Sequence, residues 1–218
     1  FVAFLAYQMR LLSPVQGLMG LWANFATAKV SLRRVHQILD VEPEVVESET
    51  PMTLPEPRGD VVFEGVTFSF DRGGPVVEDI SFQVSQGEIL AIVGPSGGGK
   101  STVSDLLARH LDPDSGRILL DGKNLRDLSL AEIRRCVVTV DQQPFMFNTS
   151  IAENIGYARP DASRDDIATA ARAAGLSDFI ARLPEGLETT VGDRGLAISA
   201  GERQRIAVAR ALLADPAV

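Results

Sequence analysis

One stretch of nine residues combines the side chains and the backbone freedom that phosphate binding needs. It contains four glycines, a lysine and two hydroxyl residues next to the lysine, in the order Gly94-Pro95-Ser96-Gly97-Gly98-Gly99-Lys100-Ser101-Thr102. Glycines let the backbone curl so that successive N–H groups converge on an anion. The lysine supplies a charge for the β- and γ-phosphates, and the Ser101 hydroxyl can join the shell of a Mg²⁺ ion. The stretch fits G-x-x-x-x-G-K-[ST] and predicts a nucleoside triphosphate site.

Such a loop has to be held between a strand and a helix. Glu88–Val93 is a short apolar run entered through Gly87, so we expect a buried strand there. From Ser101 to Arg109 the apolar residues recur at helical spacing, which predicts a helix. Strand, glycine loop and helix stand in the order that the motif requires, and the helix directs its positive end at the phosphates. The alternative, a glycine-rich turn that binds nothing, does not explain this agreement.

Composition bounds the other possibilities. The chain has 218 residues, a formal net charge of −8 and 45% hydrophobic residues, enough for a real core. Seven acids and one base lie between Asp40 and Asp60, so this stretch contributes −6 and the remainder is near neutral. Nucleic acid is therefore not expected as a partner. The single Cys136 excludes an internal disulfide and opens an apolar run, so we expect a buried thiol.

Three regions follow one another along the chain. Residues 1–28 are mostly apolar and carry one charged residue, Arg10, and a basic flank follows from Lys29, so we expect residues 1–39 to be the end of a transmembrane domain with its cytoplasmic extension. An amphipathic soluble helix is the alternative. Residues 40–59 are acidic and rich in proline, and they predict a linker. Residues 60–218 predict the nucleotide-binding domain.

The elements of that domain are predicted from β-branched runs and from serines at helix starts. Strands are expected at Val61–Phe63, Val66–Phe70, Val76–Val77, Ile80–Val84, Arg117–Asp121 and Cys136–Val140, with a turn at Asp71–Gly74. Helices are expected at Leu130–Arg135, Ser150–Asn154, Ser163–Ala174, Ser177–Leu183 and Gly201–Ala214.

A second candidate site lies at the start of the last helix. Ser199 is placed to cap that helix, and Gly201 follows in its first turn. A capped helix N-terminus can bind an anion, although an ordinary capped helix shows the same pattern. The two motifs together favour a functional role.

In this arrangement the sequence resembles the ATP-binding cassette family. Ile198–Glu202 is similar to its signature motif, usually LSGGQ, with Ile198, Ala200 and Glu202 as departures. Gln142 stands where the family has its Q-loop glutamine, with Gln143 as the neighbouring choice. Phe70 stands where the family usually has a tyrosine that stacks on adenine. The resemblance covers the chain from about Asp60 to its end.

The resemblance implies an α/β fold of the P-loop NTPase type, with an antiparallel β subdomain and a helical subdomain, preceded by a helical segment. It implies an ATPase that uses ATP and Mg²⁺. Mg²⁺ ligation is assigned to Ser101 and Gln142, and positioning of the attacking water to Gln142. Binding of the chain's own ATP is assigned to Phe70 and to Gly94, Pro95, Ser96, Gly97, Gly98, Gly99, Lys100, Ser101 and Thr102. Contact with a partner subunit's ATP is assigned to Ser199, Ala200, Gly201 and Glu202.

Two further stretches resemble the exporters of the family. They are Thr190–Gly195, before the signature, and Phe145–Ile155, after the Q-loop. The expectation is a half-transporter in the inner or plasma membrane, paired head to tail with an identical or different subunit, with its ATP-binding domain on the cytoplasmic side. The sequence stops before the strand that would end in Asp-Glu, so this stretch alone is expected to lack the Walker B aspartate, the catalytic glutamate and turnover.

Two other functions remain as alternatives. A stand-alone ATPase subunit of an importer would need no membrane segment in the same chain. A chromosome-maintenance ATPase would need a long coiled coil between Lys100 and Ser199, and no heptad run lies there. The sequence does not identify the cargo.

Overall fold

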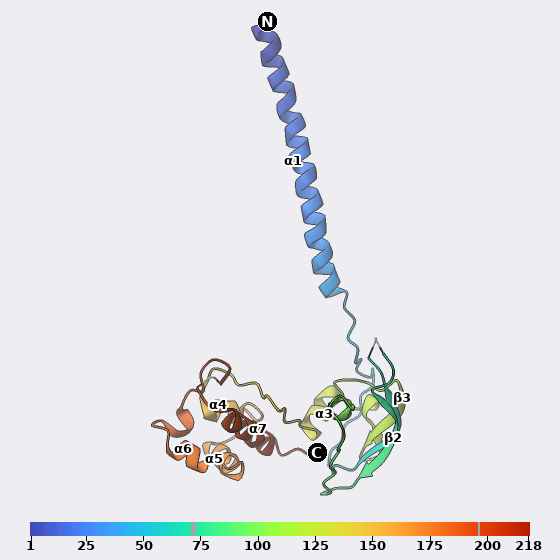
Figure 1. The fold of residues 1–218 in the computed structure, drawn as a ribbon, viewed down its shortest axis with the longest axis vertical. Helices are drawn as coiled ribbons and strands as arrows, with labels where there is room; N and C mark the ends of the chain where they lie inside the picture. The colour runs from blue at the N-terminus through green and yellow to red at the C-terminus, as the bar shows by residue number, and fades with distance from the viewer. Residues whose placement is uncertain (71–72, 196) are drawn as a thin grey trace. The chain divides into compact units, whose positions relative to one another are not determined.

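The computed structural model describes residues 1–70, 73–195 and 197–218 and divides the chain into two units, Phe1–Glu44 and Val45–Val218 (Figure 1). The first unit is one long helix, α1 (Val2–Leu39). Among the described residues, no helix combines the length and the hydropathy that crossing a membrane requires.

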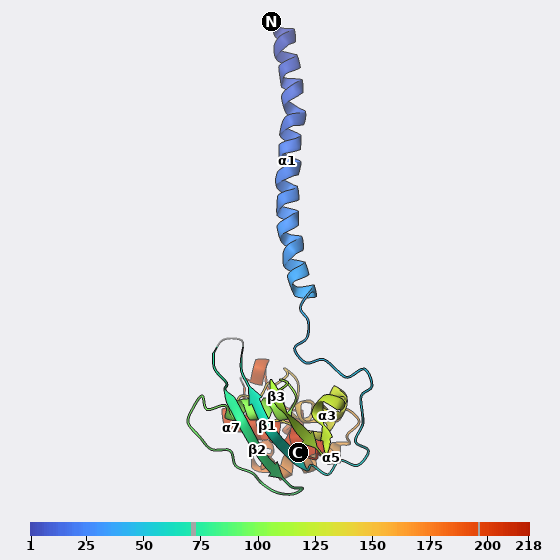
Figure 2. The same cartoon turned by 90° about the vertical axis from the view of Figure 1, so that its right-hand side faces the viewer.

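The second unit begins with a four-stranded antiparallel sheet in the order β2-β1-β3-β4. Its strands are β1 (Val61–Phe68), β2 (Val77–Val84), β3 (Ser115–Leu120) and β4 (Lys123–Asn124), and Figure 2 shows the first three side by side. The two strands predicted at Val61–Phe63 and Val66–Phe70 form one strand, whose register shifts around Gly65. The predicted turn at Asp71–Gly74 lies partly outside the described residues, which omit 71 and 72.

A first core lies on the buried face of this sheet. It includes residues from β1, from β3, from helix α2 (Lys100–Leu107) and from helix α3 (Leu130–Cys136). The short 3₁₀ turn η1 (Leu125–Asp127) follows β4 and precedes α3 along the chain. Its largest fully buried side chains are Phe63, Leu106, Leu120, Leu128 and Ile133. This core fixes α2 against the sheet, and with it the end of the predicted phosphate-binding stretch, residues 94–102, which we call the phosphate loop.

A second core belongs to a group of helices. They are α4 (Ile151–Gly156), α5 (Arg164–Ala173), α6 (Ser177–Ala181) and α7 (Ala200–Ala214), with 3₁₀ turns η2 (Gly186–Glu188) and η3 (Asp193–Gly195). Capping boxes confirm the predicted caps at Ser150, Ser163 and Ser199. The predicted cap at Ser177 is wrong, because Ser177 is already helical and Leu176 holds the cap position.

Two predicted strands are absent. The run Glu88–Val93 is not a strand, and Ile89 and Val93 are 95% and 88% exposed. In the second run, Cys136 ends α3 and residues 137–140 form no strand. A buried strand needs partners for its backbone hydrogen bonds, and within the described residues neither run pairs with a strand. The thiol of Cys136 is buried as predicted, and burial raises its pKa.

Most of the proline-rich segment is bound to the domain, and we call residues 46–60 the strap. Arg109, 4% exposed, donates to the carbonyl of Val46 at 2.9 Å. The Glu132 carboxylate accepts from the backbone of Leu54, which is buried. The Asp121 carboxylate accepts from three successive backbone N–H groups at the end of the strap, those of Arg58, Gly59 and Asp60. These contacts explain why the chain divides at Glu44 and not at Gly59.

Candidate nucleotide-binding site

The phosphate loop leads into α2 through backbone conformations that favour glycine. Gly97 and Gly99 have φ of 80° and 76°. A Cβ atom at Gly99 would lie 2.6 Å from the carbonyl oxygen of Val76, at the start of β2. Gly99 is also the N-cap of α2, and no side chain caps that helix. The first turn therefore offers its N–H groups to an external acceptor.

Lys100 curls back over the loop that precedes it. Its Nζ donates to the carbonyl of Gly94 at 3.0 Å and to that of Pro95 at 2.7 Å. Within the described residues, the ammonium group is bound by these two neutral acceptors and by no carboxylate. Beside it, Ser101 is exposed and Thr102 is 7% exposed, so Ser101 is the more accessible of the two hydroxyls.

Phe70, the predicted adenine platform, presents an accessible ring. It is 51% exposed and stands edge-on to the buried Phe68, with 4.9 Å between the ring centroids. The edge contact fixes the ring and leaves its surface available for stacking.

Gln142 lies in an exposed loop. The segment that follows it is bound by the side chain of Asn154, which is fully buried. Asn154 accepts from the N–H of Phe147 at 2.9 Å and donates to the carbonyl of the same residue at 3.0 Å. Gln142 itself is exposed, while the chain after it is held by hydrogen bonds.

The signature segment is organised by a capping box. The backbone N–H of Ser199 donates to the Glu202 carboxylate at 2.8 Å, and its hydroxyl does so at 2.6 Å. These bonds hold the pKa of Glu202 below its usual value, the hydroxyl being the main cause. Ala200 and Gly201 are exposed, and the nearest atom to a Cβ built at Gly201 is 3.9 Å away. The helix start is therefore open to an approaching group.

The structure places most of the predicted site residues on accessible surface, with Gly99 and Thr102 buried, and it does not join the two motifs. Within the described residues, no hydrogen bond or ion pair links the phosphate loop to Gln142 or to Ser199. The two motifs lie in different groups of elements, with separate cores.

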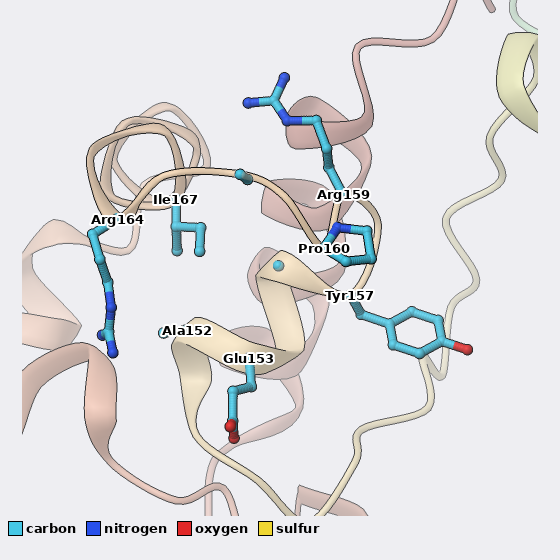
Figure 3. Close-up of a pocket in the computed structure, with 9 residues that line it drawn as sticks. Ala152, Glu153, Tyr157, Arg159, Pro160, Arg164 and Ile167 are labelled. Atoms are coloured by element: carbon cyan, nitrogen blue, oxygen red, sulfur yellow. The ribbon is translucent and has the colours of Figure 1, made fainter.

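Two cavities formed by described residues contain none of the predicted site residues. One, of about 630 Å³, lies between α4 and the start of α5 and is lined by residues such as Ala152, Pro160 and Ile167 (Figure 3). In that view the Tyr157 ring points away from the other lining residues. A second, of about 410 Å³, lies between the sheet, α2 and the exposed run after Gly87.

Sequence reasoning missed two residues that organise the site. Asn154 and Arg210 join α7 to the segment after Gln142 by hydrogen bonds. An available signal was the position of Arg210, four residues after Ile206 and three before Leu213, which places it beside the buried face of the helix.

Comparison with known proteins agrees with this arrangement. The family described as "ABC transporter" matches residues 77–218. The heavy metal tolerance protein of Schizosaccharomyces pombe is 38% identical over 218 residues, which are 100% of this chain and 26% of that protein. The beta-(1→2)glucan export ATP-binding/permease protein NdvA of Brucella suis is 38% identical over 214 residues, 98% of this chain and 36% of that protein.

A solved structure agrees as well. A bacterial Atm1-family ABC exporter with ATP bound has a TM-score of 0.82 and 40% identity, over 88% of this chain and 33% of that one. This confirms the predicted fold, an ABC nucleotide-binding domain with an antiparallel sheet and helices. The chain spans about a quarter to a third of the length of the curated relatives described above. Since the family match covers more than half of the sequence and the predicted motifs lie in order along it, the chain belongs to the ABC transporter family.

Proposed function

We propose that this chain is the ATP-binding part of an exporter that couples ATP binding and hydrolysis to transport across a membrane. The proposal rests on the phosphate loop. There, Lys100 binds two carbonyls of the loop, and the first turn of α2 has no side-chain cap. A triphosphate would replace the two neutral carbonyls on Nζ by charged oxygens, which make stronger hydrogen bonds. The exporters among the relatives favour this function over an importer subunit or a chromosome-maintenance ATPase.

The residues fit ATP and Mg²⁺ by their chemistry. A side chain at Gly99 would collide with Val76 and displace the N–H groups of α2 that would face the phosphates. The exposed oxygens of Ser101 and Gln142 are of the kind that Mg²⁺ prefers. When bound, Mg²⁺ would neutralise charge that develops on the phosphates. Phe70 would stack on the base, Lys100 would hold the β- and γ-phosphates, and Gln142 would orient the attacking water.

A second subunit completes the proposed site. Ser199, Ala200, Gly201 and Glu202 form an open helix start that is not joined to the loop of the same chain. We place this helix start against the ATP of a partner subunit, in a head-to-tail dimer with two equivalent sites. Residues 1–39 would be the end of the membrane domain and its cytoplasmic extension, which puts the ATP-binding domain on the cytoplasmic side of the membrane.

The test is MgATP binding by the full-length transporter. Replacement of Lys100→Ala removes a charge-assisted contact worth roughly 1.5–3 kcal/mol, so affinity should fall by about 10- to 100-fold. Lys123→Ala is the matched control, because Lys123 also donates to a backbone carbonyl, that of Thr53. Calorimetry with AMP adds a second control, since AMP lacks the phosphates that Lys100 would contact. Equal affinity for MgATP in the Lys100→Ala protein and the wild type would contradict the proposal.

A further inference from the structure

Near the C-terminal end of α7, Arg210 binds a different segment of the chain. Its Nε donates to the carbonyl of Asn154 at 2.9 Å, its Nη1 to the carbonyl of Phe145 at 3.3 Å, and its Nη2 to Oδ1 of Asn154 at 3.3 Å. The guanidinium carbon lies 5.9 Å from the centroid of the Tyr157 ring. These three hydrogen bonds and the ring contact all go to residues 145–157.

The surroundings of Arg210 differ from those of two other arginines near this helix group. Arg159 pairs with Asp166, and Arg164 pairs with Glu188. Within the described part of the chain, Arg210 has no carboxylate partner, and its charge rests on carbonyl and amide oxygens and on the ring. Burial lowers the pKa of its guanidinium. An apolar side chain would avoid this cost of desolvation, so a role in space filling does not account for the arginine.

The acceptors of Arg210 are fixed to the segment after Gln142. Asn154, with no exposed surface, binds Phe147 through both of its backbone groups. The same side chain donates to Oγ1 of Thr149 at 3.2 Å and to the carbonyl of Ser150 at 3.0 Å. Arg210 and Asn154 together therefore hold residues 145–150 to α7 by hydrogen bonds.

We propose that Arg210 is a positioning residue that makes α7 and the segment 142–150 move as one body. The inference rests on the proposed function, in which Ser199 at the other end of α7 meets the ATP of a partner. A helix of 15 residues is a rod of about 22 Å, so a displacement at its N-terminus reaches its far end. The hydrogen bonds of Arg210 then carry the displacement to the chain that positions Gln142. Arg210 is therefore a polar link between the two proposed ATP-sensing elements, in addition to the backbone hydrogen bonds from Val191 to Thr149 and from Ile151 to Thr189.

The experiment is hydrogen–deuterium exchange on the full-length transporter, with and without the non-hydrolysable nucleotide MgAMP-PNP. In the wild type, the nucleotide should slow exchange at three segments, 94–102, 142–150 and 198–203. In the Arg210→Met protein the first and third responses should remain. The response at 142–150 should fall about fivefold or more, the lower end of the range for coupling between sites.

Two further variants separate coupling from stability. Ile167→Val removes a methyl group from the core of the same helices without touching the link, and should keep all three responses. Arg210→Lys keeps the charge and loses the planar fork, so its 142–150 response should also be smaller than that of the wild type. If Arg210→Met does not fold, the response of Arg210→Lys at 142–150 tests the proposal instead.

Three results have distinct meanings. A wild-type response at 142–150 in a folded Arg210→Met or Arg210→Lys protein would overturn the proposal. A loss of that response in Ile167→Val would overturn it too, because general loosening would then suffice. A wild-type transporter without any response at 94–102 would instead refute the proposed function.

Discussion

Gly99→Ala should destabilise the protein and weaken MgATP binding, and Gly87→Ala provides a control with nearly the same backbone conformation. The two glycines have φ of 76° and 75°. A side chain in this left-handed region costs about 1–2 kcal/mol, and both variants share that cost. Around Gly87 a new Cβ would meet nothing within 4 Å, whereas at Gly99 it would lie 2.6 Å from the carbonyl oxygen of Val76 and 3.1 Å from a methyl of Val77.

The collision sets the difference between the variants. Ordinary van der Waals contact begins at 3.4 Å, so the start of α2 or of β2 must move by about 0.8 Å, which is 3.4 minus 2.6. Overpacking of this kind costs about 1–3 kcal/mol beyond the shared cost. That corresponds to an additional fall in Tm of roughly 2–12 °C for a chain of this size.

Thermal unfolding and calorimetry of the same preparations would measure both effects. We expect MgATP affinity within about twofold of the wild type for Gly87→Ala, and about tenfold weaker for Gly99→Ala, because the amides at the start of α2 are displaced by nearly 1 Å. Equal losses of stability in the two variants would refute the reasoning from the collision. A normal affinity in a destabilised Gly99→Ala protein would show that the amides of α2 do not contact the phosphates.

Three other predictions follow from the site. Phe70→Ala should weaken ATP and GTP binding alike, by about 1–3 kcal/mol, because a phenyl ring offers stacking without base recognition; calorimetry showing a loss for ATP only would exclude it as the platform. In the full transporter, Ser199→Arg should stop turnover and leave ATP binding by each subunit nearly intact. Mixed dimers of Ser199→Arg and Lys100→Ala chains should recover some phosphate release. Loss of ATP binding by isolated Ser199→Arg subunits would contradict a site shared between subunits. The folded protein lowers the pKa of Glu202, so the cap contributes its full stability above the unfolded-state pKa near 4.5 and loses it as the pH falls through the folded-state pKa. Glu202→Gln should therefore make the unfolding of α7 less sensitive to acid. An unchanged midpoint of acid unfolding would contradict this prediction.

Features decided by neighbouring residues could be predicted from the sequence. The cap of α7 was visible as a serine followed three residues later by a glutamate, because both partners lie within one turn. The phosphate loop was visible for the same reason, since glycine is needed where φ is positive, as at Gly97 and Gly99.

Features decided by distant partners could not be predicted. The run Glu88–Val93 has the composition of a buried strand, but burial depends on which strands lie beside it, and composition does not show that. Proline and acidic residues suggested a free linker up to Gly59, whereas its bonds are made by Arg109, Asp121 and Glu132, far along the chain. The contacts of Arg210 were hidden for the same reason, because its acceptors lie before α5 and the arginine lies near the end of α7.

The strap has a practical consequence for anyone who expresses the ATP-binding domain alone. A recombinant domain that starts at Asp60 would remove Leu54 from its buried position and leave the Asp121 carboxylate without two of its three backbone donors. The buried guanidinium of Arg109 would lose the Val46 carbonyl as well. A start at or before Val45 keeps these partners, so a recombinant domain should begin at least fifteen residues earlier than the composition of the sequence suggests.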